Sequence, residues 1–192
     1  MKLLFVALLL CIQFSYGQSG RSFYFAEIGW TIIVPPDFNI IDSGTSAKAL
    51  KGGSDIVAQN TGRKFNISTV VHLLAAKKDN QTYFIAGYDS SSKINENNWQ
   101  VIDVISTESL LKSIAKAIPF RSDTLHSSET IGGIVFKKLQ ADFHISKKIT
   151  HTVCLLSTYY RNAYFTITYS YDNEESLTEI NTMLASSGFK KQ

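Results

Sequence analysis

Residues 151–171 read HTVCLLSTYYRNAYFTITYSY, and this stretch decides the fold. In its second half, Phe165 and Ile167 alternate with Thr166 and Thr168. Alternate residues of a strand point to opposite faces of a sheet, so the alternation predicts one apolar and one polar face. The turn sequence RNA separates two strand-like runs. Together they predict an antiparallel hairpin in a half-covered sheet.

The flanking segments extend this hairpin at both ends. Upstream, ETIGGIVFKKLQADFHI predicts a strand that follows a Gly-Gly turn and precedes the turn SKK. Downstream, Asn173 is a helix N-cap residue, and Leu177, Ile180 and Leu184 form an apolar stripe at helical spacing. Gly188 is predicted to end this helix in a left-handed conformation. The last third of the chain is therefore a three-strand meander followed by a helix.

The first third begins with a predicted core strand in GWTIIVPPDF. Trp30, Ile32 and Val34 fall on one face, and the two prolines that follow stop the strand because neither offers a backbone donor. We interpret this segment as structural rather than catalytic. Residues 43–62 are rich in Gly, Ser and Ala and predict a surface excursion, with a short strand over residues 55–59 as its one regular element.

Two predicted elements occupy the middle of the chain. Residues 65–76 and the run TYFIAGYDS, joined by a turn, predict a β-hairpin, and a helix over residues 70–78 is the alternative. Residues 95–118 predict the longest helix, with Asn95 as its cap. A break near Thr107 is the alternative to one continuous helix. This order of strands and helices predicts the α+β class.

The chain begins MKLLFVALLLCIQFSYGQ. Lys2 precedes an apolar block that is too short to span a bilayer comfortably, and small residues stand three and one positions before the Gly17–Gln18 bond. The pattern predicts a signal peptide over residues 1–17, cleaved at Gly17/Gln18, with an uncleaved anchor helix as the alternative. Residues 18–192 are then a single domain that is secreted or periplasmic.

Composition narrows the classes of function. After cleavage, Cys154 is the one remaining cysteine, and its apolar surroundings in the sequence predict a buried, inert thiol. The formal net charge of +3 comes from scattered lysine pairs rather than a basic stripe, which argues against nucleic-acid binding. Beyond the leader, no apolar run is long enough to span a membrane.

Four segments together resemble the PsbP-like fold family: GWTIIVPPDF, TIGGIVFKKLQADF, YYRNAYFTITYSYDNEE and the ending LASSGFKK. That family includes the extrinsic photosystem subunit, a yeast Ran-binding nuclear-import factor and many small secreted bacterial proteins. The resemblance implies an α/β/α sandwich, in which helices lie on both faces of an antiparallel sheet. It also implies a non-enzymatic binding protein, because the two characterised members share no catalytic motif to carry over.

Two groups of residues are candidate sites. Tyr159, Tyr160 and Tyr164 cluster at the last hairpin, and any ring left exposed would offer an amphipathic platform to a sugar, a peptide or a partner protein. Core packing is the alternative for these rings. Asp142 and His144 share a strand face, and His151 follows across the turn SKK; the three could bind a divalent metal weakly. A solvated hairpin is the alternative for this trio.

The sequence contains no phosphate-binding loop, nucleophile elbow or paired-cysteine zinc motif. It therefore predicts no enzyme and no cofactor. We expect an exported, non-catalytic binding or accessory protein of the bacterial cell envelope, with a protein or small-molecule partner. Two alternatives remain open: a carrier of a small apolar ligand held between sheet and helix, and a hydrolase built around His72 or around His126 in the predicted loop SDTLHSSET.

Overall fold

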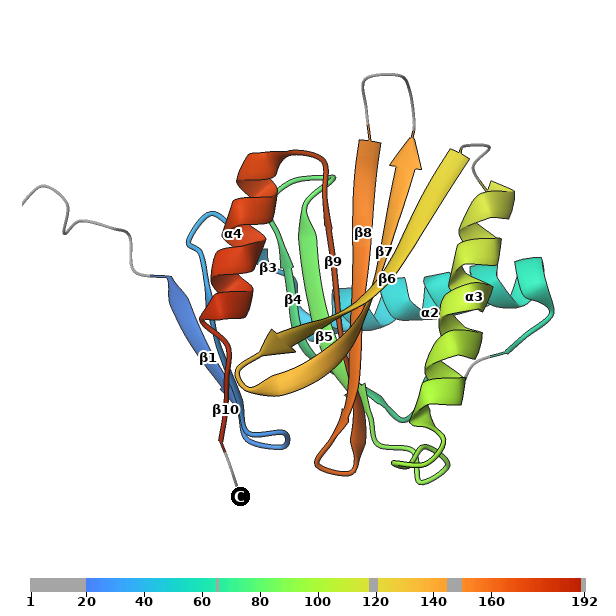
Figure 1. Cartoon of the computed structure of the whole chain (residues 1–192), viewed down its shortest axis with the longest axis horizontal. Helices are drawn as coiled ribbons and strands as arrows, with labels where there is room; N and C mark the ends of the chain where they lie inside the picture. The colour runs from blue at the N-terminus through green and yellow to red at the C-terminus, as the bar shows by residue number, and fades with distance from the viewer. Residues whose placement is uncertain (1–19, 65, 118–120, 145–149, 191–192) are drawn as a thin grey trace, which may run out of the picture.

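The computed structural model describes residues 20–64, 66–117, 121–144 and 150–190, and the predicted signal peptide with its cleavage position lies outside them. The described residues form two antiparallel sheets and three helices (Figure 1). The strands are β1 (Arg21–Phe25), β2 (Trp30–Val34), β3 (Asn39–Ile40), β4 (Val70–Lys77), β5 (Tyr83–Asp89), β6 (Arg121–Ile131), β7 (Ile134–His144), β8 (Thr150–Tyr160), β9 (Ala163–Tyr171) and β10 (Gly188–Phe189), and the helices are α2 (Ser43–Thr61), α3 (Trp99–Ala117) and α4 (Glu174–Ala185).

The larger sheet has seven strands in the order β3-β4-β5-β9-β8-β7-β6, and the smaller has the order β1-β2-β10. The predicted meander is confirmed, because β7, β8 and β9 are antiparallel neighbours in chain order. The predicted hairpin of β4 and β5 is also confirmed, and the helix considered for that segment does not form. With its large antiparallel sheet and its helices, the chain is α+β.

Strand β6 corrects one prediction. The segment SDTLHSSET, predicted as a loop around His126, lies within this 11-residue strand, which pairs with β7 along its whole length. β6 is an edge strand of the seven-stranded sheet, and its residues from Asp123 to Ser128 are all exposed. Neither face of that segment is buried, so no alternation of apolar and polar residues marks it in the sequence.

Helix α2 corrects a second prediction, because residues 43–62 were expected to be a surface excursion. Asp42 caps the helix, and its Oδ1 accepts a hydrogen bond from the backbone N–H of Thr45 at 2.9 Å. Gly62, at φ 73°, ends the helix in the left-handed conformation. Only Ser46 and Val57 are buried along it, which is why no apolar stripe is visible in the sequence.

Helix α3 is continuous through Thr107, so the alternative of a break there is wrong. It begins at Trp99, four residues later than predicted. Asn95 lies in the turn before it: its carbonyl accepts a hydrogen bond from Trp99 N, and its side chain accepts one from Asn97 N at 3.0 Å. Among the helices, α3 contacts α2, and in the larger sheet it contacts β8.

The C-terminal segment confirms one capping residue and corrects another. Asn173 caps α4 as predicted and accepts a hydrogen bond from Ser176 N at 2.9 Å. Gly188 does not end the helix in a left-handed conformation: α4 ends at Ala185, its C-cap residue Ser186 is right-handed, and Gly188 lies in β10, opposite Thr31 of β2. A β-carbon at Gly188 would lie 2.9 Å from Thr31 Oγ1. The glycine is therefore needed for the close approach of two strands.

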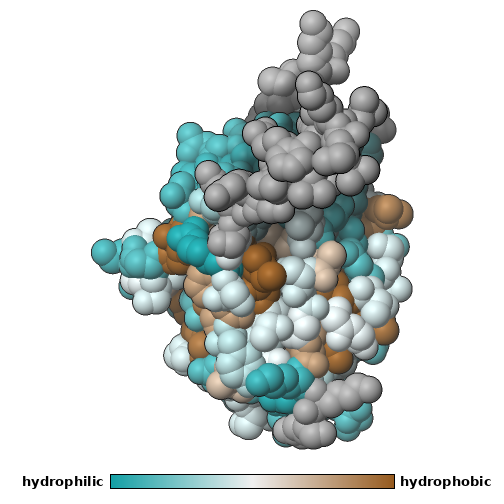
Figure 2. Space-filling model, turned by 90° about the vertical axis from the view of Figure 1, so that its left-hand side faces the viewer, coloured by the Kyte–Doolittle hydropathy of each residue, from teal (hydrophilic) through white to brown (hydrophobic). Residues whose placement is uncertain are grey.

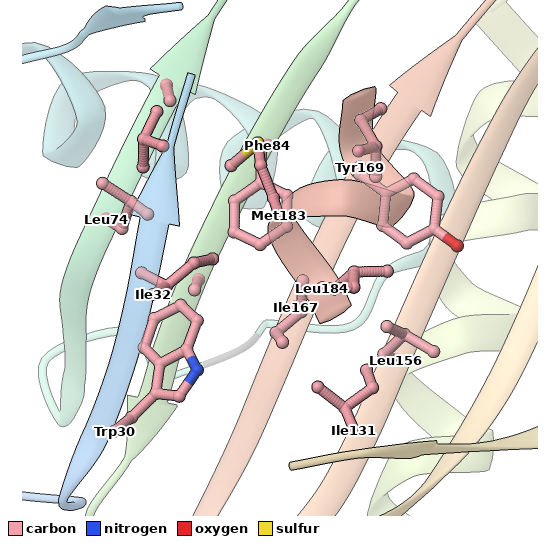
Figure 3. Close-up of a cluster of buried hydrophobic side chains, with 14 of the residues drawn as sticks. Trp30, Ile32, Leu74, Phe84, Ile131, Leu156, Ile167, Tyr169, Met183 and Leu184 are labelled. Carbon is pink, nitrogen blue, oxygen red and sulfur yellow. The ribbon is translucent and has the colours of Figure 1, made fainter. Parts of the chain in front are cut away.

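The core lies between the smaller sheet with α4 and one face of the larger sheet (Figure 3). Trp30, Ile32 and Val34 are fully buried, as predicted. They belong to one cluster with residues from α4 and from the alternating positions of β9: Phe165, Ile167, Tyr169, Ile180, Met183 and Leu184. Cys154 is also buried in this cluster as a free thiol. Burial of these large side chains is the main stabilising contribution to the fold.

Candidate ligand-binding groove

A hollow of about 430 Å³ lies between α3 and the strands β6, β7 and β8. Helix α3 supplies Val104, Thr107 and Leu111 to its wall, and the strands supply Leu139 and Leu155. The volume falls in the range of about 300–1,000 Å³ that is typical of small-molecule sites, and apolar walls with a few polar groups are their usual lining.

A second hollow of about 190 Å³ continues beneath the same helix. The two hollows share four residues: Asp103, Thr107, Leu155 and Ser157. The second adds Tyr164, Thr166 and Thr168 of β9 to the lining. We call the two hollows together the α3 groove.

The alternation of β9 explains why this space is open. Phe165 and Ile167 fill the core on one side of the strand, whereas Thr166 and Thr168 line the groove on the other. The neighbouring groove residue of β8 is Ser157, which pairs with Thr166. Ser157, Thr166 and Thr168 have short side chains, so they leave space between the strands and α3 at these positions.

The polar wall of the groove is built around Tyr164. Its Oη donates a hydrogen bond to Asp103 Oδ1 of α3 at 2.7 Å. Burial, and then the negative charge of Asp103, raise the pKa of the Tyr164 phenol far above its ordinary value, so this group remains a neutral donor. The ring of Trp99, at the start of α3, lies 6.3 Å from the Tyr164 ring between centroids. The hydrogen bond therefore ties the helix to β9.

The three tyrosines of the sequence-based platform do not share a face. Tyr159 pairs with Tyr164 across β8 and β9, so these two side chains lie on the groove side. Tyr160 points to the other side, where its ring lies 5.3 Å from that of Phe189 and its Oη donates to the Lys190 carbonyl at 3.2 Å. Of the three, Tyr164 lines the groove.

The three residues of the candidate metal site are also separated. Asp142 and His144 share a face of β7 as predicted, and Asp142 Oδ1 accepts a hydrogen bond from Thr152 Oγ1 at 2.7 Å. His151 pairs with Phe143, so the two-residue period of the strands sends it to the opposite face. Within the described ranges, no group of three or more metal-binding side chains is present. The predicted metal trio is not assembled.

His144 takes part in a different arrangement. Its Nδ1 lies 3.1 Å from Thr150 Oγ1, and its Nε2 lies 3.0 Å from Asp123 Oδ2. This chain of hydroxyl, imidazole and carboxylate has the order of a catalytic triad. However, the side chains of His144 and Asp123 are 36% and 55% exposed, and neither lines the α3 groove. Among the described residues, the group therefore lies apart from the groove and is partly open to solvent.

The two histidines of the hydrolase hypothesis lie far apart in the sheet. His72 is in β4 and His126 in β6, with four strands between them in the sheet order. His72 is partly buried, and burial lowers the pKa of its imidazole. His126 is exposed at the rim of the groove. The two do not belong to one site.

The sequence offered a site between sheet and helix only as an alternative and did not predict its residues, because the lining of the groove comes from five separate elements, α3 and β6 to β9. The one signal was the run of Thr and Ser on the second face of β9, which was interpreted as a solvated face.

On the side of the molecule shown in Figure 2, at the left of Figure 1, hydrophobic residues form separate patches among polar ones. No helix in the described part of the chain is long and apolar enough to cross a membrane.

Comparison with known proteins shows which fold this chain has. No protein-family model matches the sequence, and no curated protein matches it. The solved structure of the cyanobacterial PsbP protein (CyanoP) from Synechocystis sp. PCC 6803 is similar, with a TM-score of 0.52 and 9% sequence identity over 92% of this chain and 96% of that one. The chain therefore has a PsbP-like fold, as the sequence resemblance implied.

Two further structures were found. One is a protein from Bacteroides thetaiotaomicron VPI-5482, with a TM-score of 0.49 and 14% identity over 91% of this chain; the present chain spans 50% of its length. The other is LpqN of Mycobacterium tuberculosis, described as involved in cell envelope biogenesis, with a TM-score of 0.41 and 13% identity over 94% of this chain and 95% of that one.

Proposed function

We propose that this protein is an exported, non-catalytic binding protein of the bacterial cell envelope that holds a small apolar ligand in the α3 groove. Export is supported by the leader MKLLFVALLL and by small residues before the Gly17–Gln18 bond. A binding role without chemistry is supported by the distance between His72 and His126 and by the exposure of the Thr150–His144–Asp123 chain.

The proposal includes the α/β/α arrangement, because a groove under α3 requires that helix to cover the sheet face opposite α4. The alternation along β9 supports this. Phe165 and Ile167 share the core cluster with Ile180 of α4, whereas Thr166 and Thr168 line the hollow beneath α3. In Figure 1, α4 lies in front of the larger sheet at the left of the view, and α3 lies at the right of the view.

The single observation that carries the function is the lining of the groove. An apolar ligand gains by leaving water for walls such as Val104, Leu139 and Leu155. Tyr164 Oη donates its hydrogen bond to Asp103 Oδ1, so the phenol can border an apolar ligand without an unpaired donor. A carrier needs both properties.

The test fills the groove from its outer wall. Val104 lines the groove and is 48% exposed, so Val104→Trp places an indole at the opening without overpacking the core. We expect this variant to bind the uncharged fluorescent probe N-phenyl-1-naphthylamine at least about tenfold more weakly than the wild type. Probe fluorescence measured against protein concentration gives both dissociation constants.

Val101 provides the matched control, because it lies on the same helix, is 61% exposed and does not line the groove. Val101→Trp should leave probe affinity unchanged. Equal affinities for the wild type and both variants would contradict the proposed site. Circular dichroism melting of each variant shows whether a change in probe signal reflects the native fold.

A further inference from the structure

The charged side chains of the α3 groove are nearly all engaged with a partner. This holds for both carboxylates that line it and for one of its two lysines. The engaged groups and their partners are Asp103 with Tyr164 Oη at 2.7 Å, Glu108 with Lys112 at 3.6 Å, and Lys138 with Glu129 at 2.9 Å.

Lys137 differs from these groups. It lies on β7 between Ser128 of β6 and Ser157 of β8, whose short side chains leave its ammonium free to reach into the groove. Its Nζ lies 5.1 Å from the centroid of the Trp99 ring. Among the residues that the structure describes, no carboxylate forms an ion pair with it. An aromatic ring orients a cation but carries no net charge to neutralise it.

We propose that Lys137 is the head-group site of the groove, and that the ligand is a single-chain amphiphile with one carboxylate. This inference rests on the proposed function, because it adds an anionic end to the apolar ligand assigned to the groove. Apolar walls hold the chain, and the ammonium of Lys137 donates charge-assisted hydrogen bonds to the carboxylate. Ligands of this kind are free fatty acids and related carboxylates.

Two features select this class over other anionic lipids. The volume of about 430 Å³ lies near the lower end of the range for ligand sites, which suits one hydrocarbon chain. The lining contains no arginine, and Lys137 is its single cation without an anionic partner in the described ranges. Phosphate groups are usually held by several donors and by the fork of an arginine, whereas one ammonium suffices for a carboxylate.

The test compares two probes that differ only in the head group: dansylaminoundecanoic acid and its methyl ester. We expect the wild type to bind the acid more tightly than the ester. Lys137→Met should weaken binding of the acid at least about tenfold and leave the ester unchanged, because only the acid uses the ammonium. Lys137→Arg should retain the preference for the acid.

Lys190 provides a matched control, because its Nζ lies 4.4 Å from the Tyr24 ring, outside the groove. Lys190→Met should bind both probes as the wild type does. Equal losses for acid and ester in Lys137→Met, or no loss for the acid, would overturn the head-group inference and leave the groove intact. Loss of neither probe in Val104→Trp, or no binding of either by the wild type, would overturn the proposed function itself.

Discussion

Gly188 lies where the C-terminal strand β10 pairs with β2. It pairs with Thr31, and the Thr31 hydroxyl donates a hydrogen bond to its carbonyl at 3.1 Å. That contact holds the C-terminal strand β10 on β2. It also brings Phe189 within 6.0 Å of the Phe165 ring between centroids, so a two-residue strand places an aromatic ring against the main cluster.

We expect Gly188→Ala to lower the free energy of unfolding by about 1–3 kcal/mol, because the added methyl group would meet Thr31 Oγ1 at 2.9 Å. Urea unfolding followed by tryptophan fluorescence measures this difference. Gly52→Ala is the control: Gly52 lies in helix α2 with no atom within 4 Å of an added β-carbon, and it should raise stability by about 0.5–1 kcal/mol. Two variants of equal stability would argue against the close contact.

For single residues, the sequence predicted burial correctly where an apolar residue stands at the two-residue spacing of a strand. Trp30 and Phe165 belong to alternating apolar runs, and both are fully buried. It could not separate Tyr160 from Tyr164, because a tight turn between two strands leaves open which face each ring takes. The prediction of a left-handed stop at Gly188 was wrong, because Gly188 belongs to a strand that pairs with β2. A local sequence pattern cannot reveal this long-range pairing.

At the scale of elements, α2 shows how capping alone can define a helix. Its ends are fixed by Asp42 and Gly62, and its body buries little. Hydrogen bonds from Thr45 hold the pKa of the Asp42 carboxyl below its ordinary value of 3.8. A depressed carboxyl pKa contributes stability that is present above the unfolded-state value and is lost as the pH falls through the folded-state value.

We therefore expect Asp42→Ala to lower the urea midpoint at neutral pH, because the first turn of α2 loses its side-chain acceptor. The difference from the wild type should shrink as the pH falls from the ordinary value of 3.8 through the lower pKa of the folded state, where the carboxyl becomes protonated. Asp55→Ala, at an exposed position in the body of the same helix, should leave the midpoint unchanged or raise it slightly. A pH-independent difference would contradict the capping role.

Helices and strands whose apolar residues recur at a regular spacing were predicted, and those without such a spacing were missed. β8, β9 and α4 carry their apolar residues at the spacing of their own structure, so their boundaries agree closely with the prediction. β6 and α2 are held by backbone pairing and by caps, and each has little buried surface. The capping pair Asp42 and Gly62 was the one readable signal for α2.

At the scale of the whole molecule, the two faces of the seven-stranded sheet have different roles. Large side chains fill the face toward α4, and this packing stabilises the domain. In the arrangement that we propose, small hydroxyl side chains on the other face leave the α3 groove open. The sequence indicated both faces of β9, but α3, which we propose to cover the second face, ends at Ala117, far from Ala163 along the chain and beyond the reach of local patterns.

The most direct measurement is to map where a ligand binds, by amide proton–nitrogen NMR spectra of the labelled protein titrated with dansylaminoundecanoic acid. We predict that the largest shift changes fall on α3 around Thr107, on β7 around Lys137 and on β8 around Leu155, and that β1, β2 and α4 stay unperturbed. Changes centred on α4 and the smaller sheet, or no changes at saturating probe, would contradict a ligand-binding groove beneath α3.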